Sequence, residues 1–506
     1  MGASMLRKFI YGLLFLIFLV LPLVGSVWRV DLDSREQATV PRTAFVHLFE
    51  WKWEDVAQEC ESFLGPKGFA AVQISPPNEH AVIAREGYPW WQRYQPVSYK
   101  IKSRSGDRTQ FTHMVERCRA AGVEIYADAV INHMSGELSG KGSAGSTFTK
   151  YHYPRLYESR NFHSCRRNIE DYGNHEQVTT CELSGLPDLK TGSSYVRHQI
   201  ANYLIDLVNL GVTGFRIDAA KHIHTKDLGA ILSLVQKSVT TQSYIMQEVI
   251  DPGTEAVRKS EYYSHGDVYE FEYGRLVGAK FLGLEGQNLS QLETLGEGWG
   301  LAPSDKAIVF IDNHDKQRGH GGGGNYLTYK HGRLYELANV FMLAHPYGYP
   351  DLMSSYTFSD SEQGPPADAN GNTRSVYHSG QVSCFEEWQC EHRWQAIANM
   401  VGFRNHTSTN PLTHWWSNGA NQIAFGRGDQ GFVVINRESD RFTHTLQTDM
   451  APGTYCNIIE GELNADGTGC TATGANATVT VDRHRRVTVA VEGMGAIAIH
   501  RGAKVS

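Results

Sequence analysis

Four separate stretches of this chain place ionisable and amide side chains directly after an apolar run. The densest is "GFRIDAAKHIH" (214–224), which leaves a hydrophobic segment and presents Arg216, Asp218, Lys221 and His222. The other three end in Asp128, Asn132 and His133; in Glu248 and Asp251; and in Asp312, Asn313, His314 and Asp315. A lone aspartate after a strand usually caps a helix or a turn. Four such sets in one chain instead indicate a shared site.

Converging carboxylates of this kind suit the hydrolysis of glycosidic bonds. One carboxylate attacks or stabilises the sugar, and a second, protonated one releases the leaving oxygen. Arg216 and Asp218 are two residues apart, so on a strand they face the same side, and the guanidinium favours an ionised Asp218. Glu248 follows the apolar "YIM", and burial near other carboxylates would raise its pKa. We therefore expect Glu248 to be the acid.

The elements that must position these side chains are short apolar runs separated by helical stretches. Their spacing, mostly about 25–40 residues, fits one strand and one crossover helix. The runs are 44–51, 70–76, 123–133, 214–219, 244–249, 267–274, 307–315 and 340–348. The stretch 194–211 has helical spacing and ends at Gly211. Eight such units predict an α/β fold, a (β/α)8 TIM barrel, whose active site lies at the C-terminal strand ends. A doubly wound parallel sheet is the alternative.

Two segments do not fit the repeat. About 60 residues rich in Gly, Ser, His and Tyr follow His133, which is too long for a structureless loop, so we expect a small inserted domain after strand 3. After residue 410, "NQIAFGRGDQGFVVINR" and "RRVTVAVEGMGAIAIH" alternate apolar and polar residues and predict a C-terminal antiparallel β-sandwich domain. The predicted boundaries are 1–26 for a signal peptide, 36–132 and 191–410 for barrel domain A, 133–190 for inserted domain B and 411–506 for C-terminal domain C.

The N-terminus and the cysteines indicate an oxidising compartment. "MLRKFIYGLLFLIFLVLPLVGSV" has a basic start, an apolar run and small residues near Ser26, which is typical of a cleaved secretory signal. An uncleaved membrane anchor is the alternative. Eight cysteines favour four disulfides in a secreted protein. Three pairs close short loops, Cys165–Cys181, Cys384–Cys390 and Cys456–Cys470, which leaves Cys60 for Cys118.

The composition limits the class of partner. A net charge of -7, a pI of about 6.3 and the lack of a long basic run argue against nucleic acid. The chain has 10 Trp and 24 Tyr, which suits stacking on flat ligands, although core packing explains most of them. We expect a monomer that is secreted and has no membrane contact after signal cleavage.

The strand-end segments carry a family resemblance. "DAVINH", "GFRIDAAKH", "QEVID" and "FIDNHD" resemble the four sequence regions of the alpha-amylase family, glycoside hydrolase family 13. "VHLFEWKWEDVAQECESFLGPKGFAAVQISPPNE", "WWQRYQPVSY", "KQRGHGGGG" and "MSSY" are similar to the animal-type members. The resemblance covers nearly all of the chain after residue 40. It implies retaining endo-hydrolysis of internal α-1,4-glucosidic bonds in starch and glycogen, with maltooligosaccharides as further ligands.

The resemblance also implies roles for single residues. Asp218 would be the nucleophile, Glu248 the general acid and base, and Asp315 the transition-state stabiliser. The substrate-binding residues would be Trp90, Trp91, Tyr94, His133, Arg216, Lys221, His222, His314 and His320. A place in the core is the alternative for the adjacent tryptophans. His320 opens a glycine-rich stretch (320–324) that would form a lid, with an ordinary turn as the alternative.

One structural Ca²⁺ follows from the same resemblance. In the family it lies between the barrel and the insert and binds an Asn, an Asp and backbone carbonyls. Here these map to the side chains of Asn132 and Asp188 and to the carbonyls of Thr179 and His222. Oxygen ligands suit this hard cation.

Chloride is where the chain departs from the animal-type pattern. Those relatives usually bind it through an Arg, an Asn and a later Arg or Lys. Arg216 and Asn313 match the first two, but Asp351 in "YGYPDLMSSY" stands at the third position. Because a carboxylate repels an anion, we expect that chloride is not required and that Asp351 supplies negative charge near Arg216.

Three other functions remain open at this stage. A transglycosylase or an α-glucosidase of the same clan would use the same three carboxylates. An inactive sugar-binding relative is a second class, because a fold does not guarantee chemistry. A metal-dependent barrel hydrolase is a third, prompted by His222 and His224, although it needs several histidines on one metal ion.

Overall fold

The structure is a computed structural model that describes residues 41–322, 324 and 326–506. The prediction of a signal peptide over residues 1–26 lies outside the described residues. Within the described part of the chain, no helix combines the length and the apolar character that crossing a membrane requires.

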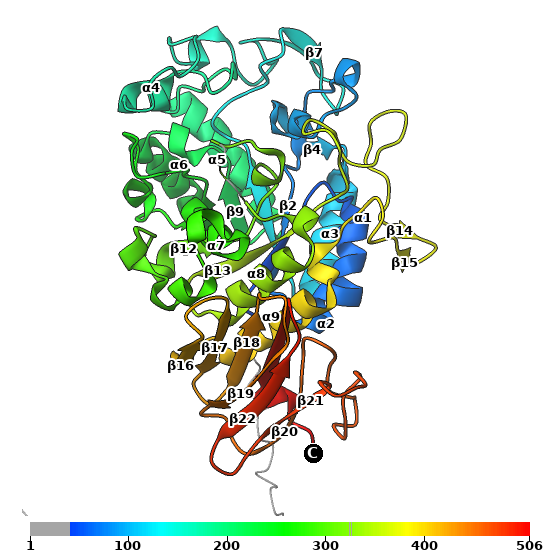
Figure 1. The fold of residues 1–506 in the computed structure, drawn as a ribbon. Coiled ribbons are helices and arrows are strands. Elements are labelled where there is room, and N and C mark those ends of the chain that lie inside the picture. Colours follow the sequence, from blue (N-terminus) through cyan, green and yellow to red (C-terminus); the bar gives the residue numbers. More distant parts are fainter. Residues whose placement is uncertain (1–40, 323, 325) are drawn as a thin grey trace, which may run out of the picture. The chain divides into compact units, whose positions relative to one another are not determined.

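Eight parallel strands close into a barrel in the order β1, β2, β6, β9, β10, β11, β12, β13, with β13 pairing to β1 (Figure 1). Their bounds are β1 Phe45–Leu48, β2 Ala71–Ile74, β6 Glu124–Ala129, β9 Gly214–Ile217, β10 Tyr244–Gln247, β11 Asp267–Tyr269, β12 Ala307–Val309 and β13 Tyr349–Ser354. The runs are short and mostly apolar because barrel strands are covered on one side by helices and filled on the other. The predicted (β/α)8 barrel is confirmed.

Helices surround the barrel in Figure 1. Their bounds are α1 Trp53–Glu59, α2 Gly65–Lys67, α3 Arg108–Ala120, α5 Ser194–Asn209, α6 Thr225–Ser238, α7 Phe271–Leu282, α8 Arg333–Ala344 and α9 Gln395–Thr407. The helix predicted over 194–211 is α5. Gly211 has a φ of 102°, which lets the chain turn away from the helix at little cost.

The prediction for the eighth strand was wrong. Residues 340–348 form the end of α8 and the following turn, and the eighth strand is β13. Nearly every residue of α8 after Leu334 is buried, so its apolar run shows no clear period and cannot be told from a buried strand. β13 carries Pro350 and Asp351, two residues that strands disfavour, so the sequence hides it.

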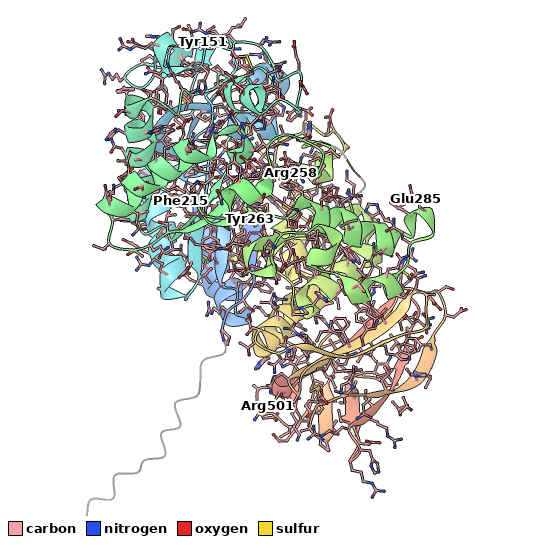
Figure 2. The ribbon with its side chains drawn as sticks, turned by 90° about the vertical axis from the view of Figure 1, so that its left-hand side faces the viewer. Tyr151, Phe215, Arg258, Tyr263, Glu285 and Arg501 are labelled. Atoms are coloured by element: carbon pink, nitrogen blue, oxygen red, sulfur yellow. A yellow bond between two sulfur atoms is a disulfide. The ribbon has the colours of Figure 1, made fainter. Side chains whose placement is uncertain are left out.

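Between β6 and α5 the chain forms a separate folded segment beside the barrel strand ends. It contains the hairpin of β7 (Ser139–Lys141) and β8 (Thr147–Thr149) and the short helix α4 (His175–Thr180). Figure 2 labels Tyr151 on this segment and Phe215 in the barrel. A small sheet of β3 (Asn78–His80), β4 (Pro96–Ser103) and β5 (Gly106–Asp107) precedes α3. The predicted domain boundaries stay a prediction.

The C-terminal part consists of two antiparallel sheets. One contains β16 Leu412–Ser417, β17 Gln422–Arg427, β18 Gly431–Asn436 and β23 Gly495–His500; the other contains β19 Phe442–Gln447, β22 Arg486–Val491, β21 Thr478–Val481 and β20 Gly453–Cys456. Val434 and Ile499 of the first sheet share an apolar cluster with Val487 and Val489 of the second. This packing confirms the predicted C-terminal sandwich. A two-residue hairpin, β14 (Tyr377–His378) with β15 (Gln381–Val382), precedes α9.

Arg427 ties the C-terminal sheets to the barrel helices. Its fully buried guanidinium donates to the carbonyls of Ala344 at 2.6 Å, Thr407 at 2.7 Å and Asn410 at 2.9 Å. Ala344 and Thr407 are the last residues of α8 and α9, so one cation contacts the carbonyl ends of two helices, and Thr407 also accepts the N–H of Asn410 at 3.0 Å.

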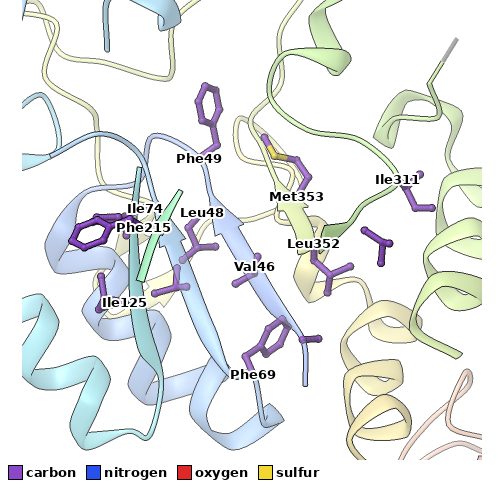
Figure 3. Close-up of a cluster of buried hydrophobic side chains, with 14 of the residues drawn as sticks. Val46, Leu48, Phe49, Phe69, Ile74, Ile125, Phe215, Ile311, Leu352 and Met353 are labelled. Carbon is purple, nitrogen blue, oxygen red and sulfur yellow. The ribbon is translucent and has the colours of Figure 1, made fainter. Parts of the chain in front are cut away.

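The barrel core is apolar and fixed at its edges by buried charges and disulfides. Figure 3 shows Val46, Leu48, Ile74 and Leu352 packed around the strands. The side chain of Glu59, at the end of α1, is fully buried and accepts hydrogen bonds from a histidine and an arginine, His392 Nε2 at 2.8 Å and Arg393 Nε at 2.7 Å.

All four predicted disulfides are present. They are Cys60–Cys118, Cys165–Cys181, Cys384–Cys390 and Cys456–Cys470. Short sequence separations identified three of the pairs, because a short loop closes at low entropic cost. Four disulfides fit an extracellular protein.

Candidate active site

Strand register brings the predicted carboxylates to one end of the barrel. Asp128 on β6 lies opposite Arg216 on β9, and Met246 on β10 flanks Arg216 on the other side. Asp218 and Glu248 each follow the last residue of their strand, so both stand just beyond Arg216. The C-terminal strand ends of a barrel therefore gather these groups, as the sequence predicts.

Arg216 contacts three carboxylates at once. Its Nη1 lies 2.7 Å from Asp128 Oδ1 and 2.6 Å from Asp218 Oδ1, and its Nη2 lies 3.1 Å from Glu248 Oε2. The residue is only 2% exposed, so these contacts form in a poorly solvated environment. The planar fork of the guanidinium fixes the relative positions of the three carboxylates.

The environment raises the pKa of each carboxyl in this cluster. Burial raises the pKa of Asp218 to about 7 and that of Glu248 to about 7, in both cases against the lowering effect of Arg216. Burial raises the pKa of Asp128 to about 6, and it also raises the pKa of Asp315. Neighbouring carboxylates add to the rise for Asp128, Asp218 and Glu248, so these three groups interact strongly enough to titrate together.

The backbone after β9 holds Glu248 in place. The N–H of Ala219 donates to Glu248 Oε2 at 2.7 Å, and the N–H of Lys221 donates to the backbone carbonyl of Glu248 at 3.1 Å. Ala219 has φ 48° and ψ 32°, a left-handed conformation that costs a non-glycine residue about 1 kcal/mol or more. This conformation directs the N–H of Ala219 toward Glu248. Strained backbone of this kind is typical of functional sites, where the surrounding structure holds it in place.

Aromatic rings form a wall beside the carboxylates. The His314 ring lies parallel to the Tyr94 ring, with centroids 5.1 Å apart and an interplanar angle of 4°, and 5.6 Å from the Trp90 ring. Tyr94 Oη donates to Asp128 Oδ2 at 2.9 Å. His314 Nε2 lies 3.7 Å from Asp315 Oδ1. The wall is thus connected to the carboxylates at both ends.

The aromatic wall lines one cleft of about 710 Å³. All three predicted catalytic residues face it. The predicted substrate contacts that face it are Trp90, Trp91, Tyr94, His133, Lys221, His222, His314 and His320. Arg216 does not line the cleft and lies behind the carboxylates.

The basic residues of the cleft are held by the inserted segment and by neighbouring loops. His133 Nε2 lies 3.0 Å from the carbonyl oxygen of Tyr94, and His222 Nδ1 lies 2.9 Å from that of Val178. Lys221 Nζ donates to the carbonyl of Ile250 at 2.5 Å and to Glu255. These contacts orient the side chains toward the cleft without a ligand.

Comparison with known proteins identifies the family. The family described as "Alpha amylase, catalytic domain" matches residues 68–350, and "Alpha amylase, C-terminal all-beta domain" matches residues 415–502. The chain belongs to the alpha-amylase family of glycoside hydrolases. Pancreatic alpha-amylase of Rattus norvegicus is 45% identical over 478 residues, covering 89% of this chain and 93% of the relative.

Further relatives agree with this family assignment. Alpha-amylase 1B of Homo sapiens is 45% identical over 481 residues, covering 90% of this chain and 93% of the relative. The crystal structure of wild-type alpha-amylase I from Eisenia fetida has a TM-score of 0.86 and 43% identity, covering 91% of this chain and 97% of that chain. The family resemblance and the barrel with a C-terminal all-β domain are therefore confirmed.

The residues that alpha-amylase resemblance assigns to calcium lie on adjacent segments. His133 and Asp188 pair as an isolated bridge, and the N–H of Leu189 donates to the carbonyl of Asn132 at 2.9 Å. Asp188 Oδ2 contacts His163 Nδ1 at 2.5 Å, whereas its buried Oδ1 has no hydrogen-bond partner among the described residues. An unpartnered buried carboxylate oxygen beside an amide side chain fits a hard cation.

Carboxyl groups surround Arg216, the first residue of the predicted anion site of this alpha-amylase family member. Asp351 is buried in the barrel, and burial raises its pKa well above the ordinary value, which favours the neutral acid. Asn313 Oδ1 accepts the N–H of Lys316 at 2.8 Å. Asp128, Asp218 and Glu248 make the close contacts with Arg216, and the expectation that Asp351 supplies negative charge near Arg216 stays a prediction.

Sequence reasoning missed three acidic residues of the site. The sequence places Asp128 at a strand end but indicates no role for it, because its position opposite Arg216 depends on strand register. Glu255 pairs with Lys221, and Glu362 lies in the cleft wall; both come from loops that no motif marks. Two other strand-end aspartates have structural roles: Asp251 accepts the N–H of Gly253 at 2.8 Å, and Asp312 accepts Tyr335 Oη at 2.8 Å.

Proposed function

We propose that this alpha-amylase family member hydrolyses internal α-1,4-glucosidic bonds of starch and glycogen with retention of configuration. The observation that carries the proposal is the contact of Arg216 with Asp128, Asp218 and Glu248 at the end of an aromatic-walled cleft. A relative supports the substrate class: a glutamate-to-glutamine mutant of alpha-amylase I from Eisenia fetida was solved as a maltohexaose complex, at 43% identity.

The reaction uses two displacements. In the first, the Asp218 carboxylate attacks the anomeric carbon as the glycosidic C–O bond breaks, and Glu248 gives its proton to the leaving oxygen. In the second, the Glu248 carboxylate takes a proton from water, the water oxygen attacks the anomeric carbon, and the bond to Asp218 breaks. Two inversions give net retention.

This assignment requires an ionised Asp218 and a protonated Glu248 at the start of the cycle. Both carboxyls have a pKa of about 7, so the cluster holds protons in the neutral range. The Arg216 contact is shorter to Asp218, at 2.6 Å, than to Glu248, at 3.1 Å. The closer cation favours the negative charge on Asp218 and leaves the proton on Glu248.

The remaining residues bind and orient the sugar. Asp315 accepts hydrogen bonds from sugar hydroxyls and strengthens them as the oxocarbenium-like centre forms. His133, His222 and His314 hydrogen-bond the unit at the cleavage point, and Lys221 contacts the next unit. Trp90, Trp91 and Tyr94 offer rings on which sugar faces stack.

One Ca²⁺ completes the proposed enzyme. Asn132, Asp188 and the carbonyls of Thr179 and His222 would hold it, and bound calcium would clamp the inserted segment to the barrel. Asp188 Oδ1 is the oxygen that lacks a partner among the described residues. We also propose that the protein is a secreted monomer. Its four disulfides support secretion.

Chloride is not required in this proposal. Asp351 offers no positive charge to an anion, and Arg216 is already paired with carboxylates. Starch hydrolysis by chloride-free enzyme should therefore change less than two-fold on addition of chloride, since no site takes up the ion. A several-fold activation would contradict this part of the proposal.

Product analysis on soluble starch tests the function. The wild type should lower viscosity rapidly and release short maltooligosaccharides in the α-anomeric form, whereas Asp218→Asn and Glu248→Gln should both abolish the reaction. Glucose alone, or longer transfer products, would move the assignment to an α-glucosidase or a transglycosylase. An inactive wild type that still binds starch would leave a binding protein.

A further inference from the structure

One turn holds both tryptophans of the cleft wall through their indole N–H groups. Trp90 Nε1 donates to the carbonyl of Ser361 at 2.9 Å, and Trp91 Nε1 donates to Glu362 Oε2 at 2.6 Å. The turn lies 271 residues after the tryptophans in the chain, between β13 and α9. The direction in which the two rings face is therefore set by a distant loop as well as by their own segment.

The second oxygen of Glu362 reaches a third segment. His320 Nε2 lies 3.0 Å from Glu362 Oε1, and the His320 ring lies 5.6 Å from the Trp90 ring. The N–H of His320 donates to the carbonyl of Asp315 at 3.0 Å. One carboxylate thus joins the tryptophan segment to the loop that carries the predicted transition-state stabiliser.

The turn that presents Glu362 is itself ordered. The N–H of Glu362 donates to Asp360 Oδ1 at 2.8 Å, and the N–H of Gln363 donates to the carbonyl of Asp360 at 3.1 Å. Tyr356 Oη donates to the carbonyl of Gln363 at 2.7 Å. These bonds place the Glu362 backbone before any ligand arrives, so its side chain needs little ordering to hold the wall.

The contacts of Glu362 add little to the stability of the fold. The side chains of Glu362 and His320 are 49% and 41% exposed, and an exposed pair of this kind stabilises a protein by about 0–1 kcal/mol. Glu362, Trp91 and His320 nevertheless all line the cleft that holds the catalytic carboxylates. These contacts therefore determine the shape of the cleft wall more than the stability of the fold.

Resting on the proposed function, we propose that Glu362 is a positioning residue for substrate binding. Its carboxylate holds Trp91 and His320 in one wall, against which a sugar unit next to the cleavage point packs. Glu362 takes no part in bond breaking, because it makes its contacts to wall residues. Its loss should weaken binding of long chains, which reach the whole wall, and should leave the chemical step nearly intact.

The test compares three variants on maltoheptaose and maltotriose. Glu362→Ala should raise KM for maltoheptaose about five-fold, the size expected for losing charge-assisted hydrogen bonds at an exposed site, with kcat changed less than two-fold. KM for maltotriose should move less. Glu362→Gln keeps an oxygen that can accept the Trp91 N–H and should recover most of the affinity.

Glu386→Gln is the matched control. Glu386 and Glu362 border the same hollow beside the cleft, so the control removes an equal charge from the same surface. It should leave both KM values unchanged. An equal rise in KM in this control would assign the effect to surface charge and overturn the proposal, as would unchanged constants in Glu362→Ala.

A binding measurement separates this inference from the proposed function. In the Glu248→Gln background, which removes the acid, maltoheptaose should bind about five-fold more weakly when Glu362→Ala is added, because wall contacts do not depend on turnover. If the wild type does not hydrolyse starch, the proposed function fails. If it hydrolyses starch but Glu362→Ala binds maltoheptaose normally, only the role of Glu362 fails.

Discussion

Replacing Asp128 by Asn should shift the pH range of activity to lower pH. Asp128 contacts the same guanidinium as Asp218 and Glu248, so the substitution removes one negative charge and leaves Arg216 with fewer anionic partners. Both changes favour the ionised forms of the remaining carboxyls and lower their pKa. Activity needs Glu248 protonated, so a lower pKa for Glu248 moves the alkaline limb of the profile down.

The size of the shift follows from the geometry. Two carboxylates that share one guanidinium lie about 5 Å apart, and at an effective dielectric constant of about 20 their repulsion is about 3 kcal/mol, or about two pH units. We therefore expect a downward shift of about two pH units in the alkaline limb, starting from the pKa of about 7 for Glu248.

The assay is kcat/KM on a chromogenic maltooligosaccharide across the pH range, since this ratio reports the free enzyme. Asp267→Asn is the control, because Asp267 begins β11 at the opposite end of the barrel and accepts Tyr244 Oη at 2.7 Å. Its profile should not move. An alkaline limb that stays in place or rises in Asp128→Asn, with the fold intact by circular dichroism, would refute the charge argument.

Three further predictions concern stability. Glu59→Gln should lower the free energy of unfolding by about 3 kcal/mol, because it leaves the mostly buried guanidinium of Arg393 without its counter-charge. Hydrogen bonds and charge from His392 and Arg393 outweigh the burial of Glu59 and lower its pKa from 4.5 to about 2. The stabilisation is therefore present above pH 4.5 and is lost as the pH falls from about 4.5 to 2. Urea titrations should show a smaller difference in unfolding free energy between variant and wild type at about pH 3 than at about pH 7. Replacing Cys165 and Cys181 by serines should lower the free energy of unfolding by about 3 kcal/mol, the value expected for so short a loop. The inserted segment should then be cleaved by protease at a lower temperature than in the wild type. Chelation should lower the Tm of the wild type and added calcium should restore it, whereas Asp188→Asn should respond to neither; an equal response in that variant would place the ion elsewhere.

The sequence could predict the parts of this fold that local residues determine. Strand-end motifs such as "GFRIDAAKH" identify both an element and its chemistry, because a barrel always presents the residues after its strands at one face. The disulfides were predictable because three pairs are close in the chain. The eighth strand was not, since Pro350 and Asp351 hide it and the neighbouring helix α8 is buried on nearly all sides.

The contacts that shape the cleft were beyond local reasoning. Asp128 obtains its role from its partner across the sheet, which is 88 residues away, and Glu362 obtains its role from tryptophans 271 residues away. The burial of Asp351, which raises its pKa, likewise results from the packing of β13 against strands that are distant in the chain. Such effects depend on the packed structure and leave no periodic or compositional signal.

Arg427 has a consequence for how this molecule can be divided. A guanidinium from the C-terminal sheets closes the ends of two barrel helices, so cutting the chain before Leu412 would remove a donor from the carbonyls of Ala344, Thr407 and Asn410. The two parts should melt in a single calorimetric transition. What looks like an appended module is then an obligate piece of the catalytic scaffold.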